Sequence, residues 1–203
     1  GRAVGRQPHT GYDEWAVDGK LALRLSEGAE LTVGHQSVRQ DDVWRTHRTI
    51  YGITWKGLQH GTDQYLFYDQ ARDLTWMRLS LREAAPAVSH LTATVYRQWQ
   101  GEDEYRMKED GARSRQGFDV VTWGANLQLE SEVSWGRWVY GVDASRDSVD
   151  SYSHKLAENG TVRSRAIQGP VADDATYDLV GVYVQPIWTG EHSKWQIVPG
   201  ARY

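Results

Sequence analysis

Residues 118–133 read FDVVTWGANLQLESEV, and their polarity alternates along the chain. Every second position belongs to a largely apolar face, made of Trp123, Ala125, Leu127, Leu129 and Ser131. The positions between them give a polar face, made of Thr122, Gly124, Asn126, Gln128 and Glu130. Because successive side chains of a β-strand point to opposite faces of its sheet, this period of two predicts a strand with one apolar and one polar face.

The same alternation recurs in the rest of the chain. From Arg137 onward, one face carries Trp138, Tyr140, Val142 and Ala144, and the opposite face includes Val139, Gly141, Asp143 and Ser145. Shorter apolar rows of the same period occur at Leu21–Leu25, Met77–Leu81, Leu91–Val95 and Val180–Val184. No stretch has a convincing helical period, so we predict an all-β chain. Its strands are expected at about 13–25, 30–43, 65–84, 90–107, 117–133, 136–152, 176–188 and 194–203.

The connections between these strands alternate in length. Short links at 26–29, 85–89, 134–135 and 189–193 alternate with longer polar links at roughly 44–64, 108–116 and 153–175. Short turns at one end and long loops at the other are typical of outer-membrane barrels, in which the short turns face the periplasm. We therefore predict antiparallel up-and-down strands that form a partial transmembrane β-barrel, as one domain over residues 1–203.

The aromatic residues favour the same interpretation. The chain has 10 Trp and 11 Tyr but only 2 Phe, and amphipathic rings are preferred where membrane meets water. Six Trp residues occupy the same alternating positions as the apolar residues of their strands, on the apolar face. Three of them lie toward the short turns, namely Trp138, Trp188 and Trp195. The other three, Trp15, Trp99 and Trp123, lie toward the long loops. We predict two belts of lipid-interface aromatics. Arg97 shares this parity between Val95 and Trp99, which suits a position already above the bilayer.

Several classes of chemistry find no support in the sequence. The absence of cysteine excludes disulfides and thiol catalysis, and the net charge of −4, with both signs interspersed, gives no nucleic-acid-binding footprint. The seven histidines are scattered, and His35 and Gln36 are expected to make hydrogen bonds near a strand end. We expect no catalytic residue, no metal site and no cofactor. Polar inward rows are predicted at Lys20 and Arg24, Arg78 and Arg82, and Asn126, Gln128 and Glu130.

Four phrases resemble the barrel of TonB-dependent receptors: GHQSVRQDDVWRTHRT at 34–49, YDQARDL at 68–74, GPVADDATY at 169–177 and IVPGARY at 197–203. The resemblance implies a bacterial outer-membrane barrel of roughly 22 strands with a plugged lumen. It also implies contact with outer-membrane lipid, with the plug domain of the same protein and with a TonB-type energy coupler. No plug, signal peptide or closing C-terminal strand is recognised between Gly1 and Tyr203, so we expect a fragment of such a receptor.

The leading functional hypothesis is TonB-energised uptake of a scarce solute such as an iron–siderophore. The loops near 44–64 and 153–175 would capture the ligand, although the sequence identifies no ligand-contacting residue. A passive porin-like channel wall, which would conduct ions without an energy source, is one alternative. A soluble carbohydrate-binding β-protein, which would need no detergent, is another.

Two further expectations concern stability. Eight strands of a larger barrel leave two open edges, so this segment alone is expected to aggregate. Val142→Arg is expected to place a charge on the lipid face, whereas Gly141→Arg would test that face little because Gly141 is expected to face inward.

Overall fold

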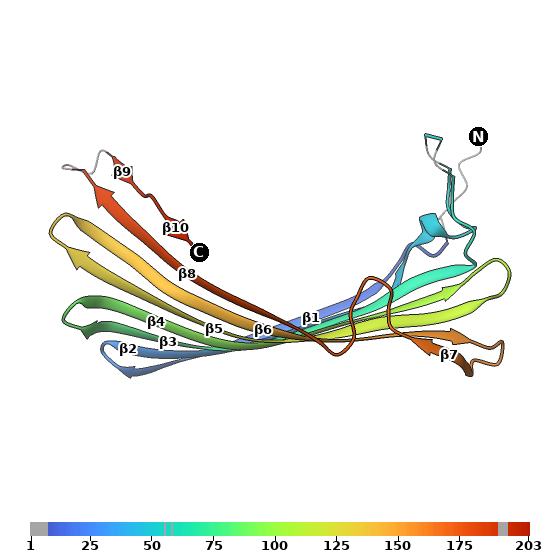
Figure 1. Ribbon diagram of the computed structural model, residues 1–203, viewed down its shortest axis with the longest axis horizontal. Helices are drawn as coiled ribbons and strands as arrows, with labels where there is room; N and C mark the ends of the chain where they lie inside the picture. Colours follow the sequence, from blue (N-terminus) through green and yellow to red (C-terminus); the bar gives the residue numbers. More distant parts are fainter. Residues whose placement is uncertain (1–7, 55, 58, 191–194) are drawn as a thin grey trace.

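The computed structural model describes residues 8–54, 56–57, 59–190 and 195–203, and these form a single antiparallel sheet (Figure 1). The long strands are β1 (Asp13–Ser26), β2 (Ala29–Trp44), β3 (Tyr65–Ala85), β4 (Val88–Met107), β5 (Arg113–Val133), β6 (Gly136–Leu156) and β8 (Ala175–Thr189). Three short strands are β7 (Val162–Ala166), β9 (Gln196–Ile197) and β10 (Ala201–Arg202). A 3-10 turn, η1, covers Thr46–Arg48. The all-β prediction is confirmed, and no helix in the described ranges is long and apolar enough to cross a membrane.

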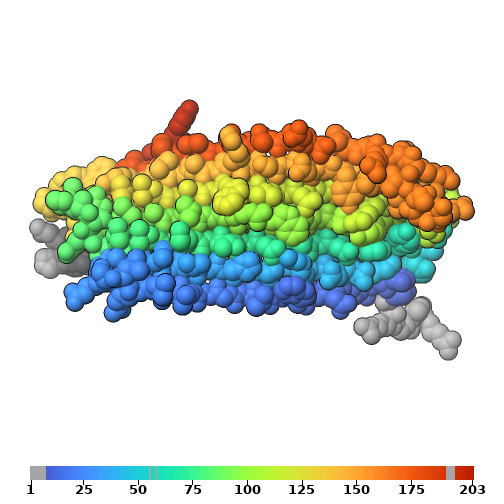
Figure 2. All heavy atoms as spheres, turned by 90° about the horizontal axis from the view of Figure 1, so that it is seen from below, coloured from blue at the N-terminus to red at the C-terminus, as the bar shows by residue number. Residues whose placement is uncertain are grey.

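The sheet has the predicted up-and-down topology. Its order is β1-β2-β3-β4-β5-β6-β8-β10, with β7 folded back on β6 and β9 on β8. Figure 2 shows the long strands side by side in chain order, from blue to red. Over the described residues the sheet stays open, with β1 along one edge and the short β9 and β10 beside β8 at the other.

The two ends of the sheet differ as the sequence predicts. Two-residue turns at 27–28, 86–87 and 134–135 lie at one end, on the left of Figure 1, together with the end of β8 at Thr189. The segments 45–64, 108–112 and 157–161 lie at the opposite end. We call these the short-turn end and the long-loop end.

Three strand predictions need correction. The continuous strand predicted at 194–203 is wrong, because only β9 and β10 pair with β8 and Pro199 between them has no N–H to donate; residue 194 lies outside the described residues. The predicted loop 153–175 contains the end of β6 and all of β7, a strand of five residues whose alternation is too short to stand out within a polar link. The predicted loop 108–116 shrinks to five residues because β5 begins at Arg113.

The sheet has almost no protein core. Leu66, 5% exposed, is the buried hydrophobic residue found among the described residues. The accessible surface is 14272 Å², whereas a compact monomer of 23.1 kDa would expose about 9,700 Å². The difference arises because no second layer covers either face of the sheet.

The register between strands lines up residues of similar polarity in rows that cross each face of the sheet. One row of the apolar face runs through Leu23, Leu31, Leu79, Ala93, Leu127, Val142 and Val182. The matching row of the polar face runs through Arg24, Glu30, Ser80, Thr92, Gln128, Gly141 and Tyr183. The alternation seen in single strands is therefore a property of the whole sheet.

On the polar face, large rings lie over glycines of the neighbouring strand. Gly34 pairs with Trp76, Gly124 with Tyr96 and Gly141 with Tyr183. A Cβ atom at each glycine would overlap the facing side chain, for example at 2.6 Å from the Tyr183 hydroxyl oxygen at Gly141. Because the backbone oxygen of Leu127 also crowds that position, any larger side chain at Gly141 would have to displace its neighbours.

We predict that Gly124→Ala destabilises the protein by about 1–3 kcal/mol, the usual cost of overpacking, because the Tyr96 ring must move. Urea unfolding of the full-length protein in lipid vesicles measures the loss. Gly19→Ala is the matched control, because a Cβ there meets nothing within 4 Å. In a protein that already carries Tyr96→Ala, Gly124→Ala should cost much less stability, because the ring that it displaces is gone. An equal effect of Gly124→Ala and Gly19→Ala would contradict the packing described here.

Candidate functional site

The apolar face carries a tryptophan cluster at the short-turn end. Trp138 of β6 and Trp188 of β8 both contact Trp135, with ring centroids 5.6 and 6.4 Å away. Trp195 lies at the same end, where its carbonyl accepts a hydrogen bond from the Gly190 N–H. The structure therefore gathers the three predicted residues. Trp135 was missed because it sits in a turn, where parity assigns no face.

The three tryptophans predicted for the other end lie at successive heights rather than in one ring. Trp123 pairs in register with Arg97, Trp99 lies one row farther toward the long loops, and Trp15 lies one row beyond that. The Trp99 indole N–H donates to Asp119 at 3.0 Å. These three tryptophans lie on the apolar parity of their strands, but at this end they are spread along the strands; their place at a lipid interface stays a prediction.

A compensated cation lies between two of these rings. The Arg39 guanidinium is 5.6 Å from the ring centroids of both Trp15 and Trp99. It also pairs with Asp73 at 2.7 Å, and Asp73 accepts a hydrogen bond from the Ser37 hydroxyl at 2.5 Å. This cluster makes the apolar face polar beyond the Trp123 row.

The apolar band has a definite height. Trp123 and Ser131, the register partner of Trp138, lie eight residues apart on β5. At about 3.4 Å per residue this is about 27 Å along the strand, or about 20 Å for a strand tilted by about 45°. Outer-membrane barrels carry an apolar band of about 25 Å between aromatic girdles. The two tryptophan levels therefore have a spacing close to that of membrane interfaces.

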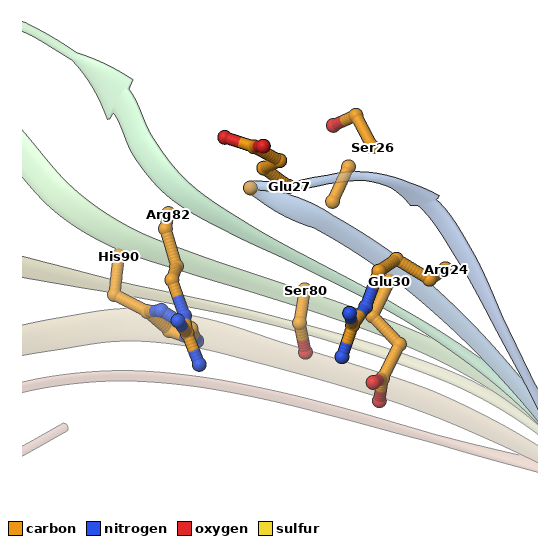
Figure 3. Close-up of a pocket in the computed structure, with 9 residues that line it drawn as sticks. Arg24, Ser26, Glu27, Glu30, Ser80, Arg82 and His90 are labelled. Carbon is orange, nitrogen blue, oxygen red and sulfur yellow. The ribbon is translucent and has the colours of Figure 1, made fainter.

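The polar face is basic toward the short-turn end of β1–β4. Figure 3 shows Arg82 beside His90 and Arg24 beside Glu30, around a hollow of about 260 Å³. In the described part of the chain, Arg24 and Arg82 have no carboxylate within ion-pair distance. By contrast, on β5–β10 of the same face, Arg137 pairs with Glu130 and Arg202 with Asp143. The two unpaired arginines thus lie on the same half of the face.

Toward the long-loop end, the polar face carries carboxylates held by neutral donors. Gln70 donates to Glu102, and Glu104 accepts from Gln116 at 3.1 Å and from the Tyr68 hydroxyl at 2.6 Å. Burial, together with the hydrogen bond to Glu104 and its negative charge, raises the pKa of Tyr68 to about 12. Tyr68 therefore remains a proton donor at neutral pH.

The segment 45–64 is fastened to this end of the sheet by a buried carboxylate. Asp63, 2% exposed, accepts two hydrogen bonds of 3.0 Å from Arg106 of β4. Its main chain also bonds to Arg48 and Ile50. Beside this anchor lies a hollow of about 350 Å³, lined by Arg45, His47, Arg48, Leu66, Tyr68, Glu104 and Arg106. Four of its seven lining side chains are basic, so this hollow can attract an anionic group.

Other sequence expectations are placed as follows. His35 lies in the middle of β2 rather than near its end, and its Nδ1 is 2.9 Å from the Thr75 hydroxyl. The inward rows predicted at Lys20, Arg24, Arg78 and Arg82 do share the polar face. No group of three or more His, Asp or Glu side chains able to hold a metal ion occurs among the residues that the structure describes.

Comparison with known proteins gives a likeness of fold. No protein-family model matches the chain, and no curated protein matches it significantly by sequence. Among solved structures, it is similar to a protein described as "Copper transporter OprC", with a TM-score of 0.67 and 14% identity over 94% of this chain. The chain spans 28% of the length of that transporter. An identity this low supports a shared fold alone.

Arg106→Gln should loosen segment 45–64, because it leaves the buried Asp63 carboxylate without its charged partner. A lost buried partner of this kind costs about 1–3 kcal/mol, enough for roughly tenfold faster cleavage of the segment. Limited proteolysis of the full-length protein measures this rate. Arg163→Gln, on the exposed β7, is the control. Unchanged cleavage in Arg106→Gln would contradict the anchoring role.

Proposed function

We propose that the chain is part of the wall of a bacterial outer-membrane transporter of the TonB-dependent type. The observation that carries this proposal is an apolar face without any protein cover, opposite a continuous polar face, in one up-and-down sheet. The fold likeness over 94% of the chain to the protein described as a copper transporter supports it. Water tolerates such an apolar face poorly, whereas hydrocarbon solvates it.

In this proposal the apolar face contacts lipid and the polar face lines the lumen. The band between Trp138 and Trp123 spans the hydrocarbon, and the six predicted tryptophans lie at or beyond its two edges. The short-turn end faces the periplasm, as in other barrels with short turns on one side. The strands are long enough to continue past the bilayer at the long-loop end.

The polar face of β1–β4 contacts the plug domain carried elsewhere in the same protein. Arg24 and Arg82 lack carboxylate partners within the described chain, so an acidic surface of a plug would compensate them. Energy from a TonB-type coupler would act through that plug. In this proposal the barrel wall holds the plug in place, and energy coupling belongs to the remainder of the protein.

Solute capture is assigned to the basic hollow beside segment 45–64. Arg45 and Arg48 present guanidinium groups, which bind carboxylate or phosphate in a bidentate manner. We therefore propose a solute or chelate that carries such an anionic group. The iron–siderophore expected from the sequence is one member of this class and stays a prediction; the named structural neighbour is described as a copper transporter.

A plugged, energised receptor and a passive porin give opposite results in one assay. The full-length protein in planar bilayers should show no steady ion conductance, because the plug fills the lumen. Uptake by cells that carry the protein should stop when a protonophore dissipates the membrane energy. A steady conductance, with uptake that is unaffected by the protonophore, would support the porin-like alternative instead.

Val142→Arg tests the membrane face. Val142 is 37% exposed in the middle row of the apolar band, where an arginine is expected to cost about 2–4 kcal/mol. Folding into vesicles, monitored by gel mobility without heating, should weaken accordingly. Ser145→Arg, three residues along β6 on the polar face, is the control. Equal folding of the two variants would contradict a lipid-facing Val142, and a full-length protein that is soluble without detergent would support the soluble carbohydrate-binding alternative.

A further inference from the structure

The row that closes the apolar band at the long-loop end mixes charged, aromatic and small residues. Register places in it Gly19, His35, Thr75, Arg97, Trp123, Arg146 and Asp178. The row directly before it is apolar and consists of Leu21, Val33, Met77, Val95, Ala125, Ala144 and Val180. The polarity of this face therefore changes within two residues along every long strand.

Most polar groups of this closing row are already satisfied by a neighbour. Arg146 donates to both carboxylate oxygens of Asp178, at 2.6 and 2.9 Å. His35 is hydrogen-bonded to Thr75. The row above it is also balanced, since Asp73 pairs with Arg39.

Arg97 is the exception. Its guanidinium lies 5.9 Å from the centroid of the Trp123 ring, which is 61% exposed. No carboxylate lies within ion-pair distance of Arg97 in the described part of the chain. Below it, Val95 is 49% exposed on the same strand and face. An uncompensated cation thus stands directly at the edge of an uncovered apolar surface.

This arrangement suits one end of a lipid molecule. Acyl chains would cover Val95 and Ala125, and the headgroup of the same lipid would then lie at the height of Arg97. A guanidinium that lies over a ring and has no carboxylate partner keeps N–H donors free, and these match the oxygens of a phosphate. Tryptophan is itself preferred at headgroup level. The Arg97 guanidinium, which has no carboxylate partner among the described residues, is therefore at the height of the lipid phosphates.

We infer that Arg97 and Trp123 form a binding site for the phosphate of a membrane lipid, in the leaflet on the long-loop side. The site rests on the proposed membrane function, and it gives a role to the one cation that interrupts the apolar parity of β4. The lipid is held by two parts: its chains by the row of Val95 and Ala125, and its phosphate by Arg97.

The test uses the full-length protein in mixed micelles that contain either phosphatidylglycerol or the phosphate-free lipid digalactosyldiacylglycerol. Native mass spectrometry counts the lipids retained as the detergent concentration rises. Wild type should retain phosphatidylglycerol in preference to the glycolipid. Arg97→Gln should weaken phosphatidylglycerol binding roughly tenfold, the usual effect of losing hydrogen bonds to a charged group. Arg97→Lys, which keeps the charge but loses the planar fork, should fall between the two.

Arg72→Gln is the matched control. It removes the same charge from β3, on the polar face, where Arg72 donates to Gln98. It should leave phosphatidylglycerol binding unchanged. Equal weakening by Arg72→Gln and Arg97→Gln would overturn the site in favour of a general charge effect. Displacement of the lipid by millimolar inorganic phosphate would overturn it in favour of a site for free phosphate.

Failure of this inference is distinguishable from failure of the proposed function. If Arg97→Gln folds into vesicles and binds phosphatidylglycerol as tightly as wild type, the lipid site is wrong while the membrane wall stands. If wild type itself stays soluble without detergent and retains neither lipid, the membrane wall is wrong, and the site with it.

Discussion

The structure depends on one constraint, which is that each strand from β2 to β6 satisfies its backbone hydrogen bonds against neighbours on both sides in the same sheet. The β3–β4 ladder runs from Tyr65 paired with Met107 to Ala85 paired with Val88, with one irregularity near the turn. Because the ladder meets this demand without a second layer, each face is free to take its own chemistry. The consequence is a sheet whose faces differ completely while its backbone is uniform.

That freedom is used differently on the two faces. The apolar face changes along the strands, from the Trp135 cluster through three apolar rows to the Arg97 row, in an order that follows the layers of a membrane. The polar face instead differs from side to side. Arg137 and Arg202 are paired with carboxylates on β5–β10, whereas Arg24 and Arg82 are unpaired among the described residues of β1–β4, and large rings lie close to glycines of the neighbouring strands. Both features leave room and charge for a partner on that side.

Much of the fold could be predicted because a period of two is a local signal. The stretch around Leu127 and Gln128 fixes its strand and both faces, and the lengths of the links fix which ends of the strands lie together. The strand β7 and the Trp135 contacts could not be predicted in this way. Both depend on which distant strand or ring lies next to them, and the alternation within one strand contains no information about that. Gly141 shows the same limit, since its crowding comes from Tyr183 on another strand. The hollow beside Arg48 likewise exists only because Asp63 and Arg106, far apart in sequence, meet.

The central claim is that alternate residues of one strand contact lipid and lumen, and adjacent positions on β5 test it most directly. Single cysteines at Leu127 and Gln128, in an otherwise cysteine-free full-length protein, can carry a small fluorophore in vesicles made with brominated lipid. Strong quenching at Leu127 and weak quenching at Gln128 is the predicted result. Equal quenching at both positions, or stronger quenching at Gln128, would contradict a sheet with one face in the membrane.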